Sequence, residues 1–282
     1  MSDENNNENV GNTAGNNKVA ETINAATGLV KAIPVYQDLA QPAAQELGKS
    51  LHTVAKLVNV ALAPVSACVW GYEKIKEFVD TKVAEKLKNI NPEDIVSPAP
   101  NVAGPALEAL KYSGCNEKLS DMYACLLASA MDKNKASSAH PAFVEIIKQL
   151  TPDEARIIEF LKKDGAGRLL LLDLREVRNN GMQWRLVLGN YSILNISDVL
   201  ELPNLSGAYI DNICRLGLGS IPDDTYSASD NAESHYDMLK KSAVINSVMS
   251  KYKLSDGAKF DFNNKYCELT SLGWQFIAAC VS

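Results

Sequence analysis

The strongest constraint on this fold is a run of apolar residues spaced three and four positions apart. The run comprises Leu119, Met122, Tyr123, Leu126, Leu127, Ala130 and Met131. An α-helix has 3.6 residues per turn, so this spacing places every member of the run on one helical face. The pattern predicts an amphipathic helix whose apolar face packs against a core.

Helical patterns also dominate the residues on either side of this run. Residues 19–90 are rich in Ala, Leu and Val, and three prolines divide them into helical pieces that end with a striped helix over about 66–89. Residues 97–105 form a proline-rich break, and a short helix is expected around 143–150. Thr151, Pro152 and Glu154 then supply an N-cap, a proline at the first helical position and a capping-box partner. We therefore expect a helix that runs to Lys163.

After Gly165 the pattern changes to short apolar runs typical of strands. Strands are expected at 168–174 and 184–188, and a further strand at 259–262 is expected to turn into 266–269. Helices are expected at 203–216 and 233–253, and a last one is expected from Thr270. The fold is thus predicted to be mainly α, with a helical domain at 19–150 and a smaller α+β, winged-helix-like domain at 151–282.

Composition narrows the class of protein further. Residues 1–18 are polar and rich in Asn, so we expect a disordered tail without the apolar core of a signal peptide. The six cysteines form no CxxC pair, which favours thiols in a reducing cytoplasm over a zinc site. We expect neither a metal nor a cofactor.

No standard catalytic motif is visible. None of the three histidines (His52, His140 and His235) lies in a nucleophile or metalloprotease motif. His140 precedes a proline at an expected helix start, where it would fix the turn. Because a triad is assembled in space, sequence leaves an enzyme open, but a non-enzyme is favoured.

The charge pattern argues against nucleic acid as a partner. The net charge is −6, and residues 1–150 carry 14 basic and 17 acidic residues, the same counts as residues 151–282. A recognition helix at 203–216 would offer Asn204, Asn212 and Arg215, but Asp211 and upstream acids would repel phosphate. A protein-contacting or structural module is favoured.

A membrane contact is the alternative that stays open. Residues 57–72 carry no charge and end in Trp70 and Tyr72, residue types that favour a membrane interface. This stretch contains Pro64 and is shorter than the roughly 20 residues of a spanning helix, so a buried helix is favoured. The expected location of the protein is the cytoplasm, and with a membrane contact it would be the periphery of the inner membrane.

Several phrases of the chain together resemble one family. They are GLVKAIPVYQDLAQPAAQELGK at Gly28–Lys49, SPAPNVAGPALEALKYSGCNEKLSDMYACLLASAMD at 97–132, AHPAFVEIIKQLTPDEARI at 139–157, YIDNICRLGL at 209–218 and LTSLGWQFIAACV at 269–281. Over residues 19–282 the chain is similar to the Abi-alpha family, which is grouped with bacterial abortive infection. The resemblance implies phage defence and carries over no catalytic residue.

From this resemblance we expect a defence effector or sensor that acts through contacts with a phage or host protein. Gly28–Lys49 and Asn101–Leu107 would pack between helices or form a partner groove. The expected contact residues are Pro34, Tyr36, Gln37, Asp38, Trp70 and Tyr72. The trigger, the target and the oligomeric state do not follow from the sequence.

Overall fold

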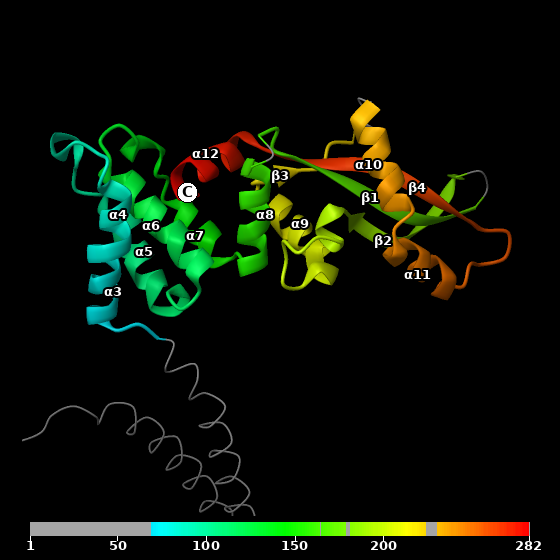
Figure 1. Ribbon diagram of the computed structural model, residues 1–282, viewed down its shortest axis with the longest axis horizontal. Helices are drawn as coiled ribbons and strands as arrows, with labels where there is room; N and C mark the ends of the chain where they lie inside the picture. Colours follow the sequence, from blue (N-terminus) through cyan, green and yellow to red (C-terminus); the bar gives the residue numbers. More distant parts are fainter. Residues whose placement is uncertain (1–68, 164, 179–180, 224–229, 282) are drawn as a thin grey trace, which may run out of the picture. The chain divides into compact units, whose positions relative to one another are not determined.

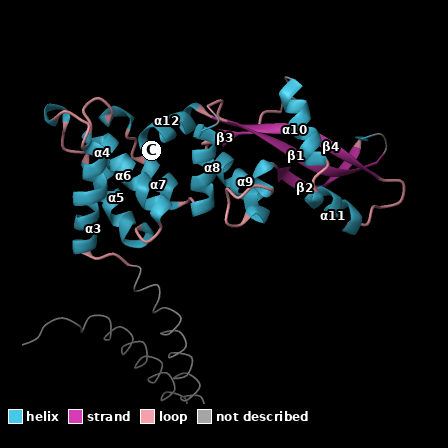
Figure 2. Ribbon diagram, in the orientation of Figure 1, coloured by secondary structure: helices cyan, strands magenta, loops and turns pink. Residues whose placement is uncertain are grey.

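The described part of the chain is mainly α-helical, with a small antiparallel sheet toward its C-terminal end (Figures 1 and 2). The computed structural model describes residues 69–163, 165–178, 181–223 and 230–281. These described residues belong to one compact unit. The predicted fold class is confirmed: helices come first, and an α+β arrangement follows. The expected tail at 1–18 and the expected helices at 19–65 lie outside the described residues.

Among the described residues, six α-helices precede the first strand. They are α3 (Tyr72–Phe78), α4 (Ala84–Leu87), α5 (Pro100–Ser113), α6 (Glu117–Met131), α7 (Ala142–Lys148) and α8 (Pro152–Lys163). A π-helical turn at Val79–Val83 joins α3 to α4, as expected for a helical stretch ending near residue 89. The expected break at 97–105 is wrong in part, because α5 begins at Pro100 and contains Pro105 in its second turn. Proline at the first helical position costs little, since that N–H has no partner within the helix.

Helix α6 is the centre of the helical part. Its residues 122–130 are all buried, so helices cover more than the one face that the apolar spacing predicted. α4, α5, α7, α8 and the last helix, α12 (Ser271–Cys280), all contact it. The Ser129 hydroxyl donates to the Ala279 carbonyl at 3.0 Å, so this buried polar group is satisfied across the α6–α12 contact.

The described residues form a sheet of four antiparallel strands in the order β2-β1-β4-β3. The strands are β1 (Arg168–Arg178), β2 (Gln183–Tyr191), β3 (Gly219–Ser220) and β4 (Lys259–Leu269). The turn expected between residues 262 and 266 is wrong. The β1–β4 ladder runs without a register shift from Arg168↔Glu268 to Val177↔Lys259 and holds β4 extended throughout.

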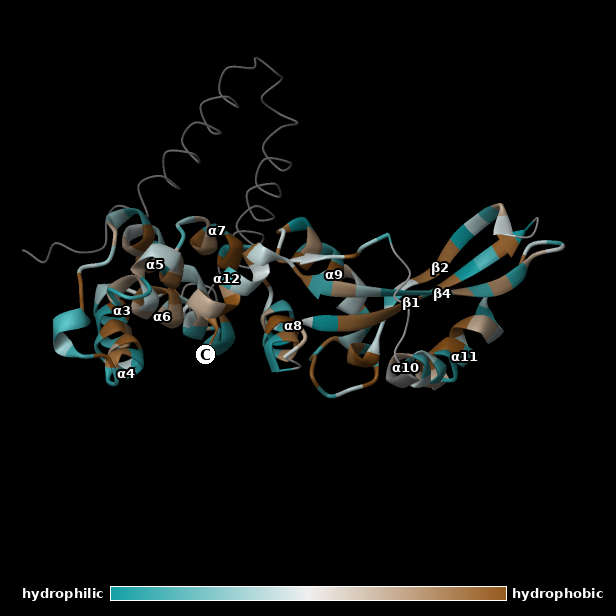
Figure 3. Ribbon diagram, turned by 90° about the horizontal axis from the view of Figure 1, so that it is seen from above, coloured by the Kyte–Doolittle hydropathy of each residue, from teal (hydrophilic) through white to brown (hydrophobic). Residues whose placement is uncertain are grey.

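Helices cover the two faces of the sheet unequally. α10 (Asp230–Lys240) and α11 (Ala243–Lys251) pack over Leu170 and Leu172. α9 (Ser206–Arg215) belongs to the larger core, together with Leu169 and Leu171 on the opposite face. Figure 3 shows α10 and α11 on one side of the strands and α9 on the other. The β1–β2 end of the sheet extends beyond α9.

The larger core continues across residue 150, where the sequence places a domain boundary. Phe143 of α7 meets Phe276 of α12 edge to face, with 5.4 Å between ring centroids. Buried side chains from Phe78 to Cys280 belong to this one cluster. The division into domains at 150/151 and the winged-helix likeness stay predictions.

A buried polar network joins the start of α8 to the elements after the sheet hairpin. The predicted capping box is confirmed, since the Thr151 amide donates to Glu154 at 2.5 Å and the Glu154 amide donates to Thr151 Oγ1 at 3.3 Å. The other Glu154 oxygen accepts from Asn212 Nδ2 of α9 at 2.7 Å. The Asp153 carboxylate accepts the amides of Glu201 and Leu202, each at 2.9 Å.

Candidate functional site

The contact residues expected from the sequence differ in their surroundings. The Trp70 ring packs against Phe78 with 5.5 Å between centroids, and a Cβ on Gly114 would collide with it, so the indole is a packing group. Tyr72 is 76% exposed. Pro34, Tyr36, Gln37 and Asp38 lie outside the described residues. A contact role for this set stays a prediction.

The polar residues considered for catalysis or base recognition have local structural partners. His140 Nδ1 accepts the Ala142 amide at 3.1 Å, which confirms that it fixes the turn before α7. Asn212 bonds Glu154, and Arg215 bonds Gln149 at 3.0 Å, so both side chains are used to hold α9. Within the described ranges, no group of three His, Cys, Asp or Glu residues could hold a metal ion. None of the helices described is both long and apolar enough to cross a bilayer.

The most distinctive surface is the end of the sheet formed by the β1–β2 hairpin. β2 is the first strand in the sheet order and pairs only with β1 among the described strands. An edge strand presents unpaired backbone N–H and C=O groups along its outer side. Natural proteins cover or disrupt such edges unless a partner uses them.

One face of this hairpin end carries an exposed apolar patch. We use "apolar patch" for Met182, Trp184 and Leu186, which are 87%, 58% and 50% exposed. Trp184 is directly opposite Val177 and Leu186 is opposite Arg175, so these side chains share one face. The Arg175 guanidinium carbon lies 4.4 Å from the Trp184 ring centroid, a cation–π contact that holds the indole in place.

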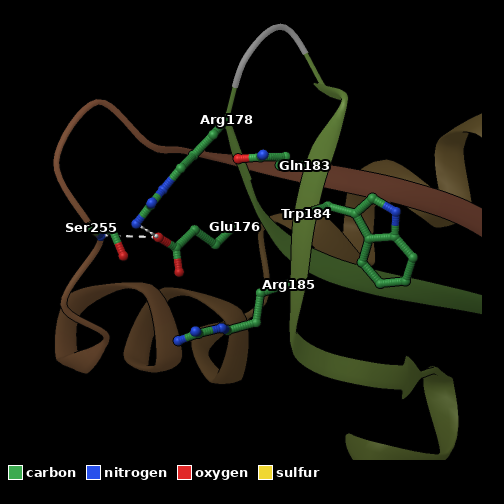
Figure 4. Close-up of a pocket in the computed structure, with 6 residues that line it drawn as sticks. All are labelled: Glu176, Arg178, Gln183, Trp184, Arg185 and Ser255. Carbon is green, nitrogen blue, oxygen red and sulfur yellow. Dashed lines mark hydrogen bonds and ion pairs between the residues drawn. The ribbon is translucent and has the colours of Figure 1, made fainter.

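The other face of the same strands forms a cleft of about 170 Å³ (Figure 4). We use "cationic cleft" for its lining residues Glu176, Arg178, Gln183, Arg185 and Ser255, with Trp184 at its border. In Figure 4, Arg178 reaches toward Glu176 and Ser255, whereas Trp184 points away from the cleft. β2 thus presents polar and apolar side chains alternately to opposite faces.

Glu176 is the only acidic residue among those that line the cleft, and neighbouring protein groups already balance its negative charge. Its side chain is buried and accepts from the Tyr252 hydroxyl at 2.7 Å and the Ser255 amide at 3.0 Å. Arg178 lies 3.6 Å away. The Tyr252 hydrogen bond, the Ser255 hydrogen bonds and the Arg178 charge together lower the pKa of Glu176 to about 2. Glu176 is therefore ionised at neutral pH.

Arg185 keeps its charge available at the cleft. Among the described residues it has no carboxylate within ion-pair distance, although it acts on the Tyr252 hydroxyl and opposes the rise in that group's pKa. The surrounding segments, 175–185 and 251–261, contain six basic and three acidic residues, whereas the whole chain has a net charge of −6. The hairpin end is thus a local positive region on an acidic protein.

Sequence reasoning missed this site because it assigned 184–188 to a strand or a buried edge and did not consider the two faces of that strand separately. Alternating Met182, Trp184 and Leu186 with Gln183 and Arg185 does indicate a strand with two unlike faces. Only the tertiary structure shows that none of the described elements covers the apolar face of this alternation. The strands expected at 168–174 and 184–188 are confirmed and extend further than predicted.

Comparison with known proteins gives one family. The family described as "Abortive infection alpha" matches residues 71–280. No curated protein matches the chain. A solved structure, described as an uncharacterized protein from the hydrocarbon-degrading marine bacterium Alcanivorax borkumensis SK2, is 16% identical. That likeness covers 53% of this chain and 96% of the other, with a TM-score of 0.36, and carries no argument about function.

Proposed function

This chain belongs to the abortive infection alpha family, and on that premise we propose that it is an anti-phage defence protein that contacts another protein through the hairpin end of its sheet. The observation that carries the second part is the β2 edge, which has the apolar patch on one face and the cationic cleft on the other. Under this proposal, the partner is a protein of the phage or of the host cell.

The chemistry of the surface defines the partner segment. An extended segment can add to a free sheet edge through backbone hydrogen bonds, with its side chains alternating between the two faces. Trp and Arg are the residue types that most often dominate the binding energy of protein interfaces. On one face of β2, Trp184 and Leu186 would contact apolar side chains of the partner segment. On the other face, Arg185 would bind a carboxylate of the partner.

Phage challenge of cells that carry this gene tests both parts. Wild-type protein is expected to protect the culture at low multiplicity of infection, with collapse of the culture at high multiplicity. Trp184→Ala and Arg185→Glu are each expected to abolish protection while far-UV circular dichroism and Tm stay within about 2 °C of wild type, because both residues are exposed.

Tyr112→Ala is the matched control, since Tyr112 is 73% exposed on α5 and lies outside the hairpin site. Protection that survives both hairpin substitutions would refute the contact site and leave the defence role standing. Wild-type protein that protects against no member of a broad phage panel would refute the defence role itself.

Exposed Trp and Arg also suit single-stranded nucleic acid, so this alternative is built into the test. Protein is favoured because the whole chain has a net charge of −6, which disfavours binding to a polyphosphate backbone, and because a strand edge offers backbone hydrogen bonds to an extended polypeptide. Fluorescence anisotropy with a labelled oligonucleotide at low salt is expected to show no binding below micromolar concentration. Tight binding that Arg185→Glu removes would replace protein by nucleic acid as the partner.

The alternative function, a membrane-perturbing effector, rests on residues 57–72, most of which lie outside the described residues. Flotation with liposomes of anionic and neutral lipid tests it directly. Under our proposal the full-length protein remains in the soluble fraction with both lipid compositions. Stable co-flotation that is lost on replacing Trp70 or Tyr72 would favour the membrane reading.

A further inference from the structure

Two cysteines from different elements meet on the α9 side of the sheet. Cys214 lies in the last turn of α9, and Cys267 lies near the end of β4. Their Sγ atoms are 3.9 Å apart, and either thiol can donate to the other. A disulfide needs an S–S distance of about 2.05 Å, so the two sulfurs have to approach by roughly 2 Å. Movement of that size is within reach of side-chain rotation and a small shift of the helix end.

The surrounding packing directs these two thiols toward each other. Cys267 is 2% exposed, whereas Cys214 is partly exposed. A Cβ on Gly219 would lie 2.9 Å from Cys267 Sγ, so the absence of a side chain at Gly219 makes the space that the sulfur occupies. The buried thiol is therefore held in place beside the partly exposed one.

Electrostatics assigns different roles to the two sulfurs. The hydrogen bond from the Cys267 thiol lowers the pKa of Cys214, and the positive charge of Lys265 lowers it further. Burial and the negative charge of Asp211 raise this pKa, but the lowering effects prevail. The same hydrogen bond and burial raise the pKa of Cys267 well above its usual range. Since the thiolate is the nucleophile, Cys214 reacts first and Cys267 follows.

We propose that Cys214 and Cys267 are a redox-active pair that hydrogen peroxide converts into a disulfide joining α9 to β4. The Cys214 thiolate attacks one peroxide oxygen, the O–O bond breaks, and Cys214 sulfenic acid forms while the departing hydroxide takes a proton to become water. The Cys267 sulfur then attacks the sulfenic sulfur, the S–O bond breaks, and its proton leaves with the hydroxyl as a second water. Overall, two thiols lose two electrons, and one peroxide is reduced to two waters.

The other described cysteines provide internal comparisons. Cys115 is exposed, so a soluble reagent can reach it, and it serves as a comparison for reactivity that depends on exposure alone. Cys125 and Cys280 are both buried, and burial raises the pKa of Cys280 well above its usual range. Exposure alone would favour Cys115, whereas the geometry favours disulfide formation at Cys214 and Cys267.

Peptide mass spectrometry of the full chain tests the proposal. Reduced protein is treated with hydrogen peroxide in low molar excess, remaining thiols are alkylated, and the protein is digested with trypsin without reduction. The expected product joins the peptide 186–215 to the peptide 266–282, two hydrogens lighter than their sum. Because the second peptide also contains Cys280, fragmentation must place the bond at Cys267.

Two variants separate the roles of the sulfurs. Cys267→Ser is expected to leave Cys214 as a sulfenic acid that dimedone labels, and Cys214→Ser is expected to leave Cys267 alkylatable after denaturation. The oxidised wild type should gain roughly 5–10 °C in Tm over the reduced form, because the bond closes a long loop. Cys214→Ser should show no such gain.

Either of two results would overturn the proposal. One is an oxidised protein in which Cys115 has reacted while Cys214 and Cys267 are both still alkylatable. The other is a Cys267→Ser protein whose Cys214 resists peroxide under conditions that form the disulfide in the wild type. If Cys267→Ser fails to fold, Cys214→Ser and the wild-type peptide map still decide the outcome.

Discussion

Replacing Asp153 by alanine should test whether the polar network at the start of α8 holds the following module in place. The Asp153 side chain is 5% exposed and accepts the amides of Glu201 and Leu202 at 2.9 Å each, together with an ion pair from Arg156 at 2.6 Å. Alanine would leave both amides without a protein partner and would remove an acid from the positive end of the helix. The loop at 201–202 would then lose two hydrogen bonds to α8 and keep the ion pair between Arg156 and Glu201.

The expected loss in the free energy of unfolding follows from these contacts. An amide left without its partner costs about 1–3 kcal/mol, and water can reach residues 201 and 202, so the low end applies to each. The lost ion pair and helix-end charge add about 1 kcal/mol together. We expect Asp153→Ala to lower the free energy of unfolding by roughly 2–4 kcal/mol, which corresponds to a fall in Tm of roughly 5–15 °C.

Urea unfolding followed by far-UV circular dichroism measures this change. Asp153→Asn keeps one acceptor oxygen and should lose roughly half as much. Asp198→Ala, an exposed position in the same loop, is the matched control and should stay within about 0.5 kcal/mol of wild type. An Asp153→Ala protein within 1 kcal/mol of wild type would refute the structural role assigned to these hydrogen bonds.

The same residue predicts a pH dependence with a definite sign. Burial would raise the pKa of Asp153, but the amides of Glu201 and Leu202 and the Arg156 contact outweigh it, so its pKa lies below the ordinary value. A carboxyl whose pKa is lower in the folded state stabilises the fold above its ordinary pKa and loses that contribution as the pH falls. The difference between wild type and Asp153→Asn should therefore shrink as the pH drops below about 4.

Three further substitutions test close packing and the cationic cleft. Gly219→Ala should cost about 1–3 kcal/mol in urea unfolding because its Cβ would lie 2.9 Å from Cys267 Sγ, and Gly219→Ala combined with Cys267→Ala should recover most of that loss. Gly273→Ala should cost about 3 kcal/mol or more and should not be rescued in this way, because its Cβ meets a backbone carbonyl oxygen rather than a side chain. Glu176→Gln should flatten the fall in stability between about pH 4.5 and pH 2, since the folded-state pKa of Glu176 is about 2 and its stabilisation is lost as the pH falls through that range. An unchanged acid-unfolding curve for Glu176→Gln would show that the contacts made by Tyr252 do not depend on the carboxylate charge.

Local signals in the chain predicted several features correctly. The capping box at Thr151 and Glu154 and the start of the last helix at Thr270 depend on hydrogen bonds between residues three apart in sequence. The Phe143 helix follows from 3.6-residue spacing. These features need no knowledge of distant segments, so the local sequence is sufficient to predict them.

Other features depend on what lies beside a segment. The apolar run at 119–131 shows the same spacing whether helices cover one face or nearly all of it, and five neighbouring helices make α6 a central helix. The turn expected within 259–269 is replaced by an unbroken strand because β1 pairs along its length. Neighbouring elements supply the partner groups, and local spacing does not contain them.

The sequence by itself determined the helical class, the change to strands after Gly165 and the family likeness, because periodicity, caps and long shared phrases are all local properties. The tertiary structure alone decided that β2 is an edge strand whose apolar face no described element covers, and that Cys214 meets Cys267. The first depends on which described elements pack over each face of β2, and the second joins residues that are far apart in the chain. A side chain's exposure and its partners are fixed by which elements pack around it, and that information appears only when the whole core is assembled.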